Sequence, residues 1–374
     1  MRQRPPHREL HFDHSIALLL LYFFNPVLTS LRGIQQASHL KKVKKMLGIS
    51  GTSLGSLSEA GNVFDASLLK PLIGELADKA IPLERDPKLR GLLQSLVVVD
   101  STLLPALPKM LWALWLDDQH KAAKLHLELD ILKHSPVGAV LTDANANERA
   151  VLRSVLSQGK LYVLDAGFGE YKFFQEIIDA GSSFVACLRD NAVRETLQER
   201  ALSKEDRRAG VQSDRVVRLG GASKQDAVTA PVRIIEIFHQ GDSSRPRKSR
   251  VSSKKTFRTT EADYMFLLIT DRLDLSAEVI ALLYRYRWQI ELFFRWFKCV
   301  LGCTHLLSFS RNGVTLQVYC ALIASMLITL WTGCKPTKRT FEMLCFYFMG
   351  WADEEEVEDH LKRLKETEAK KNVQ

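Results

Sequence analysis

The chain has 374 residues, of which 46% are apolar and 25% are charged. This composition is typical of a globular protein and excludes a disordered or fibrous one. Lysine and arginine outnumber aspartate and glutamate by 52 to 43, which favours a polyanionic partner, with nucleic acid first and an anionic membrane second.

The cysteines and the length narrow the class of protein further. Four of the six cysteines (Cys187, Cys320, Cys334 and Cys345) lie in apolar stretches, so we expect reduced core thiols and a cytosolic location, not a disulfide framework. A chain of this length exceeds one typical domain. We therefore expect two or three domains, or one core with a large insertion.

The first part of the chain, residues 1–90, is predicted to be a helical region. Residues 40–60 read LKKVKKMLGISGTSLGSLSEA, in which a lysine-rich segment meets Gly48 and a second segment follows a Ser/Thr-rich start. This pattern predicts a helix, a tight turn and another helix. Two interpretations remain open here: a helix-turn-helix that enters DNA, or two solvated helices.

Two apolar runs test whether the chain enters a membrane. The run at 16–24 is too short to span a bilayer. The run at 314–331 contains Gln317, Ser325 and Thr329, which favours a buried helix of a globular core. We expect no membrane partner.

Residues 91–189 are predicted to form the first part of an α/β core. The stretch SLVVVDSTLLP (95–105) predicts a central strand, and residues 110–132 predict two further extended runs that complete an antiparallel meander. A helix ending near Gly159, a strand at 161–165, a helix closed by Gly181 and a strand at 183–188 then predict a βαβ unit.

The rest of the chain is predicted to complete this core around an insertion. Residues 190–263 are polar with short strand-like runs and predict a β-rich insertion, which includes seven cations and no acid at 244–258. Residues 264–335 form the second part of the core and begin with a strand at 265–271; residues 336–374 are predicted to be a helical tail. The fold class that follows is α/β, a ribonuclease-H-like mixed five-stranded sheet with flanking helices.

Residues 284–302, YRYRWQIELFFRWFKCVLG, predict one helix with two contrasting sides. At about 100° per residue, Tyr284, Arg287, Glu291 and Lys298 fall within an arc of roughly 60°, flanked by Arg295. Phe293, Trp296 and Phe297 occupy the opposite, apolar side. An ordinary amphipathic surface helix with charge pairs is the alternative.

Three carboxylates distant in the sequence point to metal chemistry. Asp100 and Asp165 each follow an apolar strand, where a buried ionised group without a partner would be unfavourable. If their strands are neighbours and Glu291 packs across the strand ends, the three could bind two Mg²⁺ or Mn²⁺ ions, the metals that oxygen ligands favour. Two such ions about 3.5–4 Å apart would stabilise both oxygens of a phosphodiester displacement, while Arg287 and Lys298 held the phosphate.

The chain resembles the DDE transposases of the insertion sequence 4 family. Their signature is Tyr, two residues, Arg, three residues, Glu, six residues, Lys, and Tyr284, Arg287, Glu291 and Lys298 match it at every spacing. The resemblance extends to Asp100 in VVVDST and Asp165 in LDAGFG, with an insertion before the glutamate. Residues 190–265 contain no tryptophan, so a role of that insertion in holding a flipped base cannot be carried over.

The resemblance implies a set of expectations about function. The chain would bind terminal inverted repeats through residues 1–90, cleave the element ends with Mg²⁺-activated water, and join the freed 3′-hydroxyl to target DNA. Tyr284, Arg287, Arg295 and Lys298 would contact DNA, and a synaptic complex would pair two copies of the chain on two ends. The location would be cytoplasmic, at a prokaryotic nucleoid. A metal-dependent nuclease without strand transfer and a non-catalytic DNA-binding derivative remain as alternatives.

Overall fold

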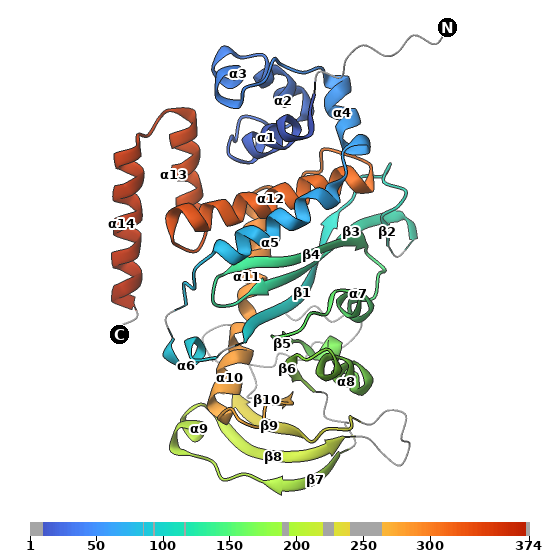
Figure 1. Ribbon diagram of the computed structural model, residues 1–374, viewed down its shortest axis with the longest axis vertical. Helices are drawn as coiled ribbons and strands as arrows, with labels where there is room; N and C mark the ends of the chain where they lie inside the picture. The colour runs from blue at the N-terminus through green and yellow to red at the C-terminus, as the bar shows by residue number, and fades with distance from the viewer. Residues whose placement is uncertain are drawn as a thin grey trace, which may run out of the picture. The chain divides into compact units, whose positions relative to one another are not determined.

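The computed structural model describes residues 10–84, 86–92, 94–115, 117–188, 194–219, 228–239 and 264–371 (Figure 1). The chain forms two compact units. Unit 1 comprises Met1–Arg85, Asp100–Asn147 and Gln289–Gln374, and unit 2 comprises Asp86–Val99 and Glu148–Trp288. The basic run at 244–258 lies outside the described residues. The division of the chain into the five segments named above remains a prediction.

Unit 1 is mainly helical. Four of its helices, α2, α4, α12 and α13, begin where a serine or threonine caps the first turn: the side chains of Ser30, Ser53, Ser310 and Thr337 each accept a hydrogen bond from a backbone amide three residues on. The helices are α1 (Phe12–Phe23), α2 (Leu31–Ser38), α3 (Lys41–Leu47), α4 (Leu54–Val63), the 3₁₀ turn η1 (Ala66–Leu69), α5 (Lys70–Lys79), α11 (Trp288–Cys299), α12 (Arg311–Thr332), α13 (Lys338–Met349) and α14 (Glu354–Lys371).

Helix α12 is the centre of unit 1. Of the helices that the structure describes, α12 alone is long and apolar enough to cross a membrane, yet 83% of its most apolar window is buried inside the protein. It packs against α1, α4, α5 and the strand β4 (Figure 1). The sequence-based prediction of a buried helix over 314–331 is confirmed.

The antiparallel meander is present, but the sequence analysis placed one of its strands wrongly. The structure has β1 (Ser95–Pro105), the short β2 (Leu114–Trp115), a long β3 (Asp117–Asp130) and β4 (Ser135–Asp143). The strand β4 was missed because Pro136 and Gly138 are poor strand formers. Residue 138 is a glycine for a physical reason, because a Cβ there would lie only 2.9 Å from Glu128 Oε2 on β3.

Unit 2 contains the predicted βαβ unit. The strands β5 (Lys160–Leu164) and β6 (Ser183–Cys187) are parallel to each other, and β1 is parallel to β5. The crossover contains α8 (Tyr171–Asp179), and Gly181 at φ +70° ends it as predicted. Helix α7 (Glu148–Val155) precedes β5, and the short α6 (Pro87–Arg90) precedes β1.

The insertion extends the same sheet. The strands β7 (Arg194–Glu199), β8 (Val211–Leu219), β9 (Val232–His239) and β10 (Tyr264–Thr270) are antiparallel neighbours, and β10 also pairs with β6. Two of the short strand-like runs predicted in the insertion, RVVRL (215–219) and VRIIEIF (232–238), lie in β8 and β9. Helix α9 (Lys204–Arg208) connects β7 to β8, and α10 (Ala277–Tyr286) follows β10.

The strand order confirms the predicted fold class. The order is β2-β3-β1-β5-β6-β10-β9-β8-β7, with β4 paired to β3. The five strands β4-β3-β1-β5-β6 form the ribonuclease-H-like core, a mixed sheet with flanking helices. The sheet is larger than the five predicted strands because the insertion adds its strands to the edge at β6.

All six cysteines are free thiols.

Candidate active site

Asp100 lies on β1 directly after a fully apolar stretch. Residues 96–98 have no exposed surface and Val99 is 5% exposed, whereas Asp100 is half-buried. Its Oδ1 accepts a hydrogen bond from the amide of Ser101 at 2.7 Å. The strand thus presents a carboxylate at the point where its buried part ends.

Asp165 occupies the equivalent place after β5. Its Oδ1 accepts a hydrogen bond from the amide of Gly167 at 2.8 Å, which caps the 3₁₀ turn η2 (Ala166–Phe168). A Cβ on Gly167 would lie 3.0 Å from that oxygen, so the turn closes tightly around the carboxylate. Asp165 is half-buried.

The register of β1 and β5 relates the two aspartates. These strands are parallel neighbours, and the last registered pair is Val98 with Val163. Asp100 is two residues beyond Val98, and Asp165 is two residues beyond Val163. The expectation that the two strands are neighbours is confirmed.

Unit 2 also brings Tyr284 towards Asp165. The Tyr284 ring packs edge-on against Phe266, with 5.9 Å between the ring centroids. Burial raises the pKa of the Tyr284 hydroxyl, and the nearby Cys187 and the charge of Asp165 raise it further, against the opposing effect of Arg287. Tyr284 is therefore a neutral hydroxyl within electrostatic range of a candidate catalytic carboxylate.

Arg287 lies beside Tyr284 at the end of α10. Its guanidinium carbon is 6.0 Å from the centroid of the Tyr284 ring, a cation–π distance. Its amide donates to Tyr284 O at 3.1 Å, which is a 3₁₀ hydrogen bond rather than an α-helical one. The two residues thus form a compact pair within unit 2.

The predicted single helix over 284–302 is wrong in detail. The structure has two helices, α10 ending at Tyr286 and α11 beginning at Trp288, with Arg287 as a turn between them. Arg287 keeps a helical backbone conformation in this turn, with φ −50° and ψ −35°. The arc calculated for Tyr284 and Glu291 remains a prediction, and no glycine or proline marks the turn in the sequence.

Helix α11 carries the remaining candidate residues within unit 1. Phe293, Trp296 and Phe297 are buried, as predicted for the apolar side. On the other side Glu291 and Lys298 are half-buried and Arg295 is exposed. Burial lowers the pKa of Lys298, with a smaller opposing effect from Cys299. This helix offers one carboxylate and two cations along its polar side.

The insertion anchors the start of α10. The α10 N-cap residue, Ser276, makes no side-chain cap. Instead Asp206 of α9 accepts the amide of Glu278 at 2.8 Å and the amide of Ser203 at 2.9 Å. Burial opposes ionisation of Asp206, but these amides and the charge of Arg233 lower its pKa overall. A residue 72 positions upstream therefore caps this helix.

Arg233 of β9 reinforces this anchor. It is 1% exposed and forms a double hydrogen bond with Asp214 of β8. Its Nη1 donates to the carbonyl of Leu275 and, at 3.4 Å, to that of Arg272. Both carbonyls lie in the segment before α10. The sequence analysis missed Asp206 and Arg233; the SKED stretch at 203–206, which forms a capping box, was the available signal.

The predicted metal ligands are distributed over both units. Asp165 belongs to unit 2, whereas Asp100 and Glu291 belong to unit 1. Within the part of the chain that the structure describes, no group of three or more His, Cys, Asp or Glu side chains lies close enough to hold a metal ion. The donor chemistry of the three carboxylates suits Mg²⁺ or Mn²⁺, and their convergence remains a prediction.

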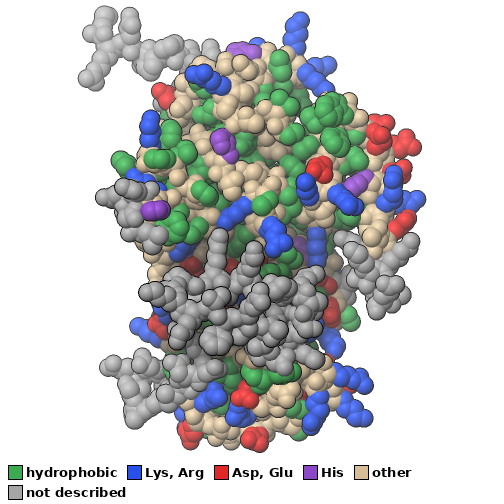
Figure 2. All heavy atoms as spheres, turned by 180° about the vertical axis from the view of Figure 1, so that it is seen from behind, with side chains coloured by type: hydrophobic (Ala, Val, Ile, Leu, Met, Phe, Trp, Pro, Cys, Tyr) green, Lys and Arg blue, Asp and Glu red, His purple; other side chains and the backbone are tan. Residues whose placement is uncertain are grey.

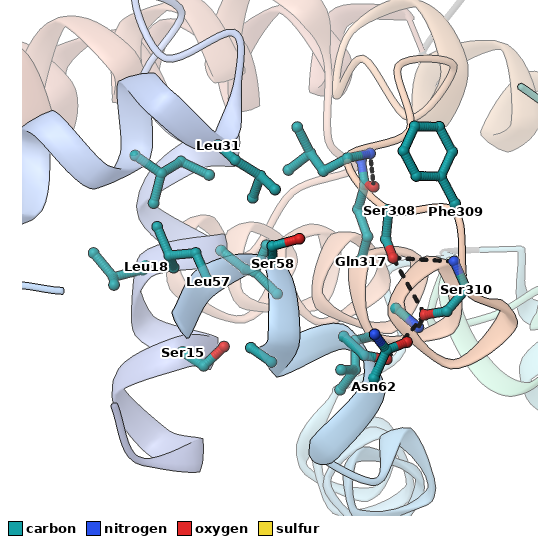
Figure 3. Close-up of a pocket in the computed structure, with 17 residues that line it drawn as sticks. Ser15, Leu18, Leu31, Leu57, Ser58, Asn62, Ser308, Phe309, Ser310 and Gln317 are labelled. Carbon is teal, nitrogen blue, oxygen red and sulfur yellow. Dashed lines mark hydrogen bonds between the residues drawn. The ribbon is translucent and has the colours of Figure 1, made fainter. Parts of the chain in front are cut away.

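Unit 1 also contains a cavity of about 400 Å³. Leu18, Leu31 and Leu57 form part of its apolar wall, and Ser308, Ser310 and Gln317 line its polar side (Figure 3). The polar groups bond to the protein itself: Gln317 accepts from Leu307 N, and Ser310 Oγ donates to Gly61 O. The cavity therefore offers no set of convergent polar groups for a reaction.

Comparison with known proteins identifies the family. Residues 91–327 match the family model described as "Transposase DDE domain". The chain belongs to this family. The match begins before β1 and ends within α12, so both strand-end aspartates, the insertion and α10–α11 lie inside the family domain.

Two curated relatives of the family domain are transposases. A putative transposase of Sinorhizobium fredii is 30% identical over 234 residues, which cover 62% of this chain and 60% of that protein. A probable transposase for an insertion sequence element of Geobacillus stearothermophilus is 25% identical over 331 residues, which cover 87% of this chain and 79% of that protein.

A cryo-EM structure of the piggyBac transposase synaptic complex with hairpin DNA aligns with a TM-score of 0.42 at 8% identity, covering 97% of this chain and 78% of that one.

Proposed function

We propose that this member of the DDE family is a transposase of an insertion sequence. It binds the terminal inverted repeats, cleaves phosphodiester bonds at the element ends, and joins the 3′-hydroxyl to target DNA. The observation that carries this proposal is the parallel register of β1 and β5, which leaves Asp100 and Asp165 at equal steps beyond a registered pair.

Asp100, Asp165 and Glu291 are the residues that would hold two Mg²⁺ or Mn²⁺ ions. When bound, such ions lower the pKa of water and neutralise charge that develops on the phosphate oxygens. The tight turn at Gly167 supports this role for Asp165. The hydrogen bond from the Gly167 amide fixes one carboxylate oxygen and thereby the orientation of the other.

The cationic residues and Tyr284 would hold the DNA beside the scissile bond. Because the Tyr284 pKa is raised, its hydroxyl stays protonated and can donate a hydrogen bond to a phosphate oxygen. Arg287 and Arg295 can each form paired hydrogen bonds with a phosphate, whereas Lys298 acts as a point charge. We assign Tyr284, Arg287 and Lys298, with Glu291, to the Tyr-Arg-Glu-Lys signature, and Arg295 lies outside that signature.

The proposed partners are duplex DNA at the element ends and at the target. A synaptic complex would contain two copies of the chain, in the cytoplasm at the prokaryotic nucleoid. Residues 1–90 would recognise the terminal repeat, 91–189 and 264–335 would form the catalytic core, 190–263 the insertion and 336–374 the tail.

Strand transfer is the reaction that tests the proposal. Labelled duplexes that carry an element end, with Mg²⁺ and a supercoiled target plasmid, should give a joined product. Glu291→Gln and Asp100→Ala should lose cleavage and joining yet retain end binding in a mobility-shift assay. Cleavage without any joined product would favour the nuclease alternative, and equal cleavage by Glu291→Gln and the unmodified protein would refute the mechanism.

A further inference from the structure

Helix α3 differs from the other helices around it in unit 1. It has seven residues, four of which are lysines, and none of the seven is buried. Its neighbours α2 and α4 each bury two or more residues. A helix whose residues are at most half-buried gains less from the hydrophobic effect than its neighbours do, so packing contributes little to its formation.

The charges of α3 also oppose its formation. Lys41 and Lys45 are four residues apart, and Lys41 and Lys44 are three apart, spacings at which like charges repel by a few tenths of a kcal/mol. Lys41 and Lys42 stand at the N-terminus, where the helix dipole disfavours cations. Across the described residues, Lys41, Lys44 and Lys45 have no carboxylate within 4.0 Å. An anionic partner would remove this repulsion.

Lys42 is an exception within the helix. Its ammonium lies 3.6 Å from where a Cβ of Gly350 would stand, at the C-terminal end of α13. Cations are favourable at that end of a helix. Among the described residues, no counter-charge lies beside the three remaining lysines.

The turn after α3 fixes the helix in place. The amide of Thr52 donates to Ser38 Oγ at 3.1 Å, and His39 Nε2 donates to Thr52 O at 3.1 Å. Gly48 ends the helix at φ +65°, and Gly51 at φ +101° leaves room for the His39 ring, which a Cβ would approach to 2.8 Å. The loop therefore returns to the end of α2 and presents α3 to solvent in one conformation.

Helix α4, the second helix of the predicted helix-turn-helix, is part of the core of unit 1. Leu57 and Ala60 are buried, and Leu57 and Asn62 line the cavity that the residues around Ser308 close from the other side (Figure 3). A Cβ on Gly61 would lie 3.1 Å from the Cα of Gly313 in α12. A helix packed this closely on α12 cannot insert into a DNA groove along that side.

We propose that α3 binds the phosphate backbone of duplex DNA through Lys41, Lys44 and Lys45. At about 100° per residue these lysines span an arc of roughly 100°, while Val43 and Leu47 face the opposite way. Both apolar residues are half-buried. Figure 2 shows lysine and arginine side chains projecting at the end of unit 1 that carries the N-terminal helices. Lysine meets a phosphate as a point charge, and we assign α3 to affinity and not to sequence recognition.

This inference rests on the proposed function, and the salt dependence of binding tests it separately. The K41A/K44A/K45A variant should keep its thermal unfolding temperature or raise it, because alanine favours a helix and removes repulsion. Three phosphate contacts correspond to a change of about 2.7 in the slope of log K against log [salt]. Between 50 and 200 mM salt the unmodified protein should therefore lose about 40-fold more affinity than the variant.

A matched control uses the same change of charge elsewhere in unit 1. Lys362, Arg363 and Lys365 are exposed on α14, and their triple alanine variant should leave the slope within experimental error of that of the unmodified protein. The α3 variant should weaken binding to an element end and to an unrelated duplex by the same factor.

Four results would overturn the inference. An unchanged slope for the α3 variant, with DNA binding intact, would refute the role of α3 and leave the transposase proposal standing. A selective loss for the element end would indicate base recognition. A loss of binding to anionic phospholipid vesicles without any loss for DNA would assign the lysines to a membrane surface. Absence of DNA binding by the unmodified protein would refute both proposals.

Discussion

Arg233 and Asp214 form a double hydrogen bond that is shielded from water, with Nε to Oδ1 at 2.7 Å and Nη2 to Oδ2 at 2.6 Å. Arg233 is 1% exposed and Asp214 is 5% exposed. The pair joins β8 to β9, and Arg233 also donates to the carbonyls before α10. The insertion is thereby connected to the helix that carries Tyr284 and Arg287.

Replacement of Asp214 should strongly destabilise unit 2. Asp214→Ala leaves a buried guanidinium without its counter-charge, which lowers the free energy of unfolding by about 3–5 kcal/mol. Urea unfolding followed by circular dichroism measures this loss. Glu195→Ala is the control, because Glu195 and its partner Arg218 are 67% and 62% exposed and such surface pairs contribute about 0–1 kcal/mol. Similar losses in both variants would contradict the assigned role of the buried pair.

Asp165→Asn should separate catalysis from stability. Asparagine caps helical turns about as well as aspartate, and its side-chain oxygen can still accept the Gly167 amide. The free energy of unfolding should therefore change by less than about 0.5 kcal/mol, while cleavage of an element end falls below detection. Asp179→Asn, an exposed change in α8 of the same unit, should retain cleavage. Cleavage by Asp165→Asn at the unmodified rate would remove Asp165 from the reaction.

Two glycines in helices should respond to alanine with opposite signs. Gly74 in α5 has no atom within 4 Å of its added Cβ, so Gly74→Ala should stabilise the protein by about 0.5–1 kcal/mol. At Gly313 in α12 the Cβ would lie 2.2 Å from Ser308 Oγ and 2.6 Å from Ser308 Cβ. Gly313→Ala should therefore destabilise by about 1–3 kcal/mol. Thermal unfolding of both variants checks the signs, and stabilisation by Gly313→Ala would show that residues 308–310 can move away at little cost.

The cysteines should differ widely in reactivity towards a thiol reagent at pH 8. Cys299 is exposed and should react first. Burial raises the pKa of Cys303 and Cys320, and it raises that of Cys345 to about 11. Since the thiolate is the reactive form, these three should react only after unfolding in guanidinium. A Cys299→Ser variant identifies the fast phase, and rapid labelling of Cys320 in the native protein would contradict the burial of α12.

Much of the fold was predictable from local sequence. The strand β1 was predicted with both of its ends, because an uninterrupted valine run between polar flanks is typical of a buried central strand. The βαβ unit followed from Gly181 and from two apolar runs of strand length. The strand β4 was not predictable, since the reason for Gly138 is the Glu128 side chain on a neighbouring strand.

The candidate site was predictable in its residue types more than in its geometry. The carboxylates after β1 and β5 stood out because an ionised side chain at the end of an apolar run is unfavourable unless it has a partner. The turn at Arg287 had no sequence signal. The capping box at 203–206 marked Asp206 as a cap of α9, but its capping of α10 depends on a contact between segments far apart in the chain, which periodicity does not report.

The division of the chain between the two units has a consequence for synthesis. Unit 2 ends at Trp288, whereas unit 1 needs residues up to the last helices as well as the first ones. A ribosome therefore delivers every residue of unit 2 while the N-terminal helices still lack α12, the helix on which they pack. Translation can be stalled at the point where Trp288 has just emerged from the ribosomal tunnel. In that nascent chain, unit 2 should resist protease, whereas the N-terminal region should still be cleaved.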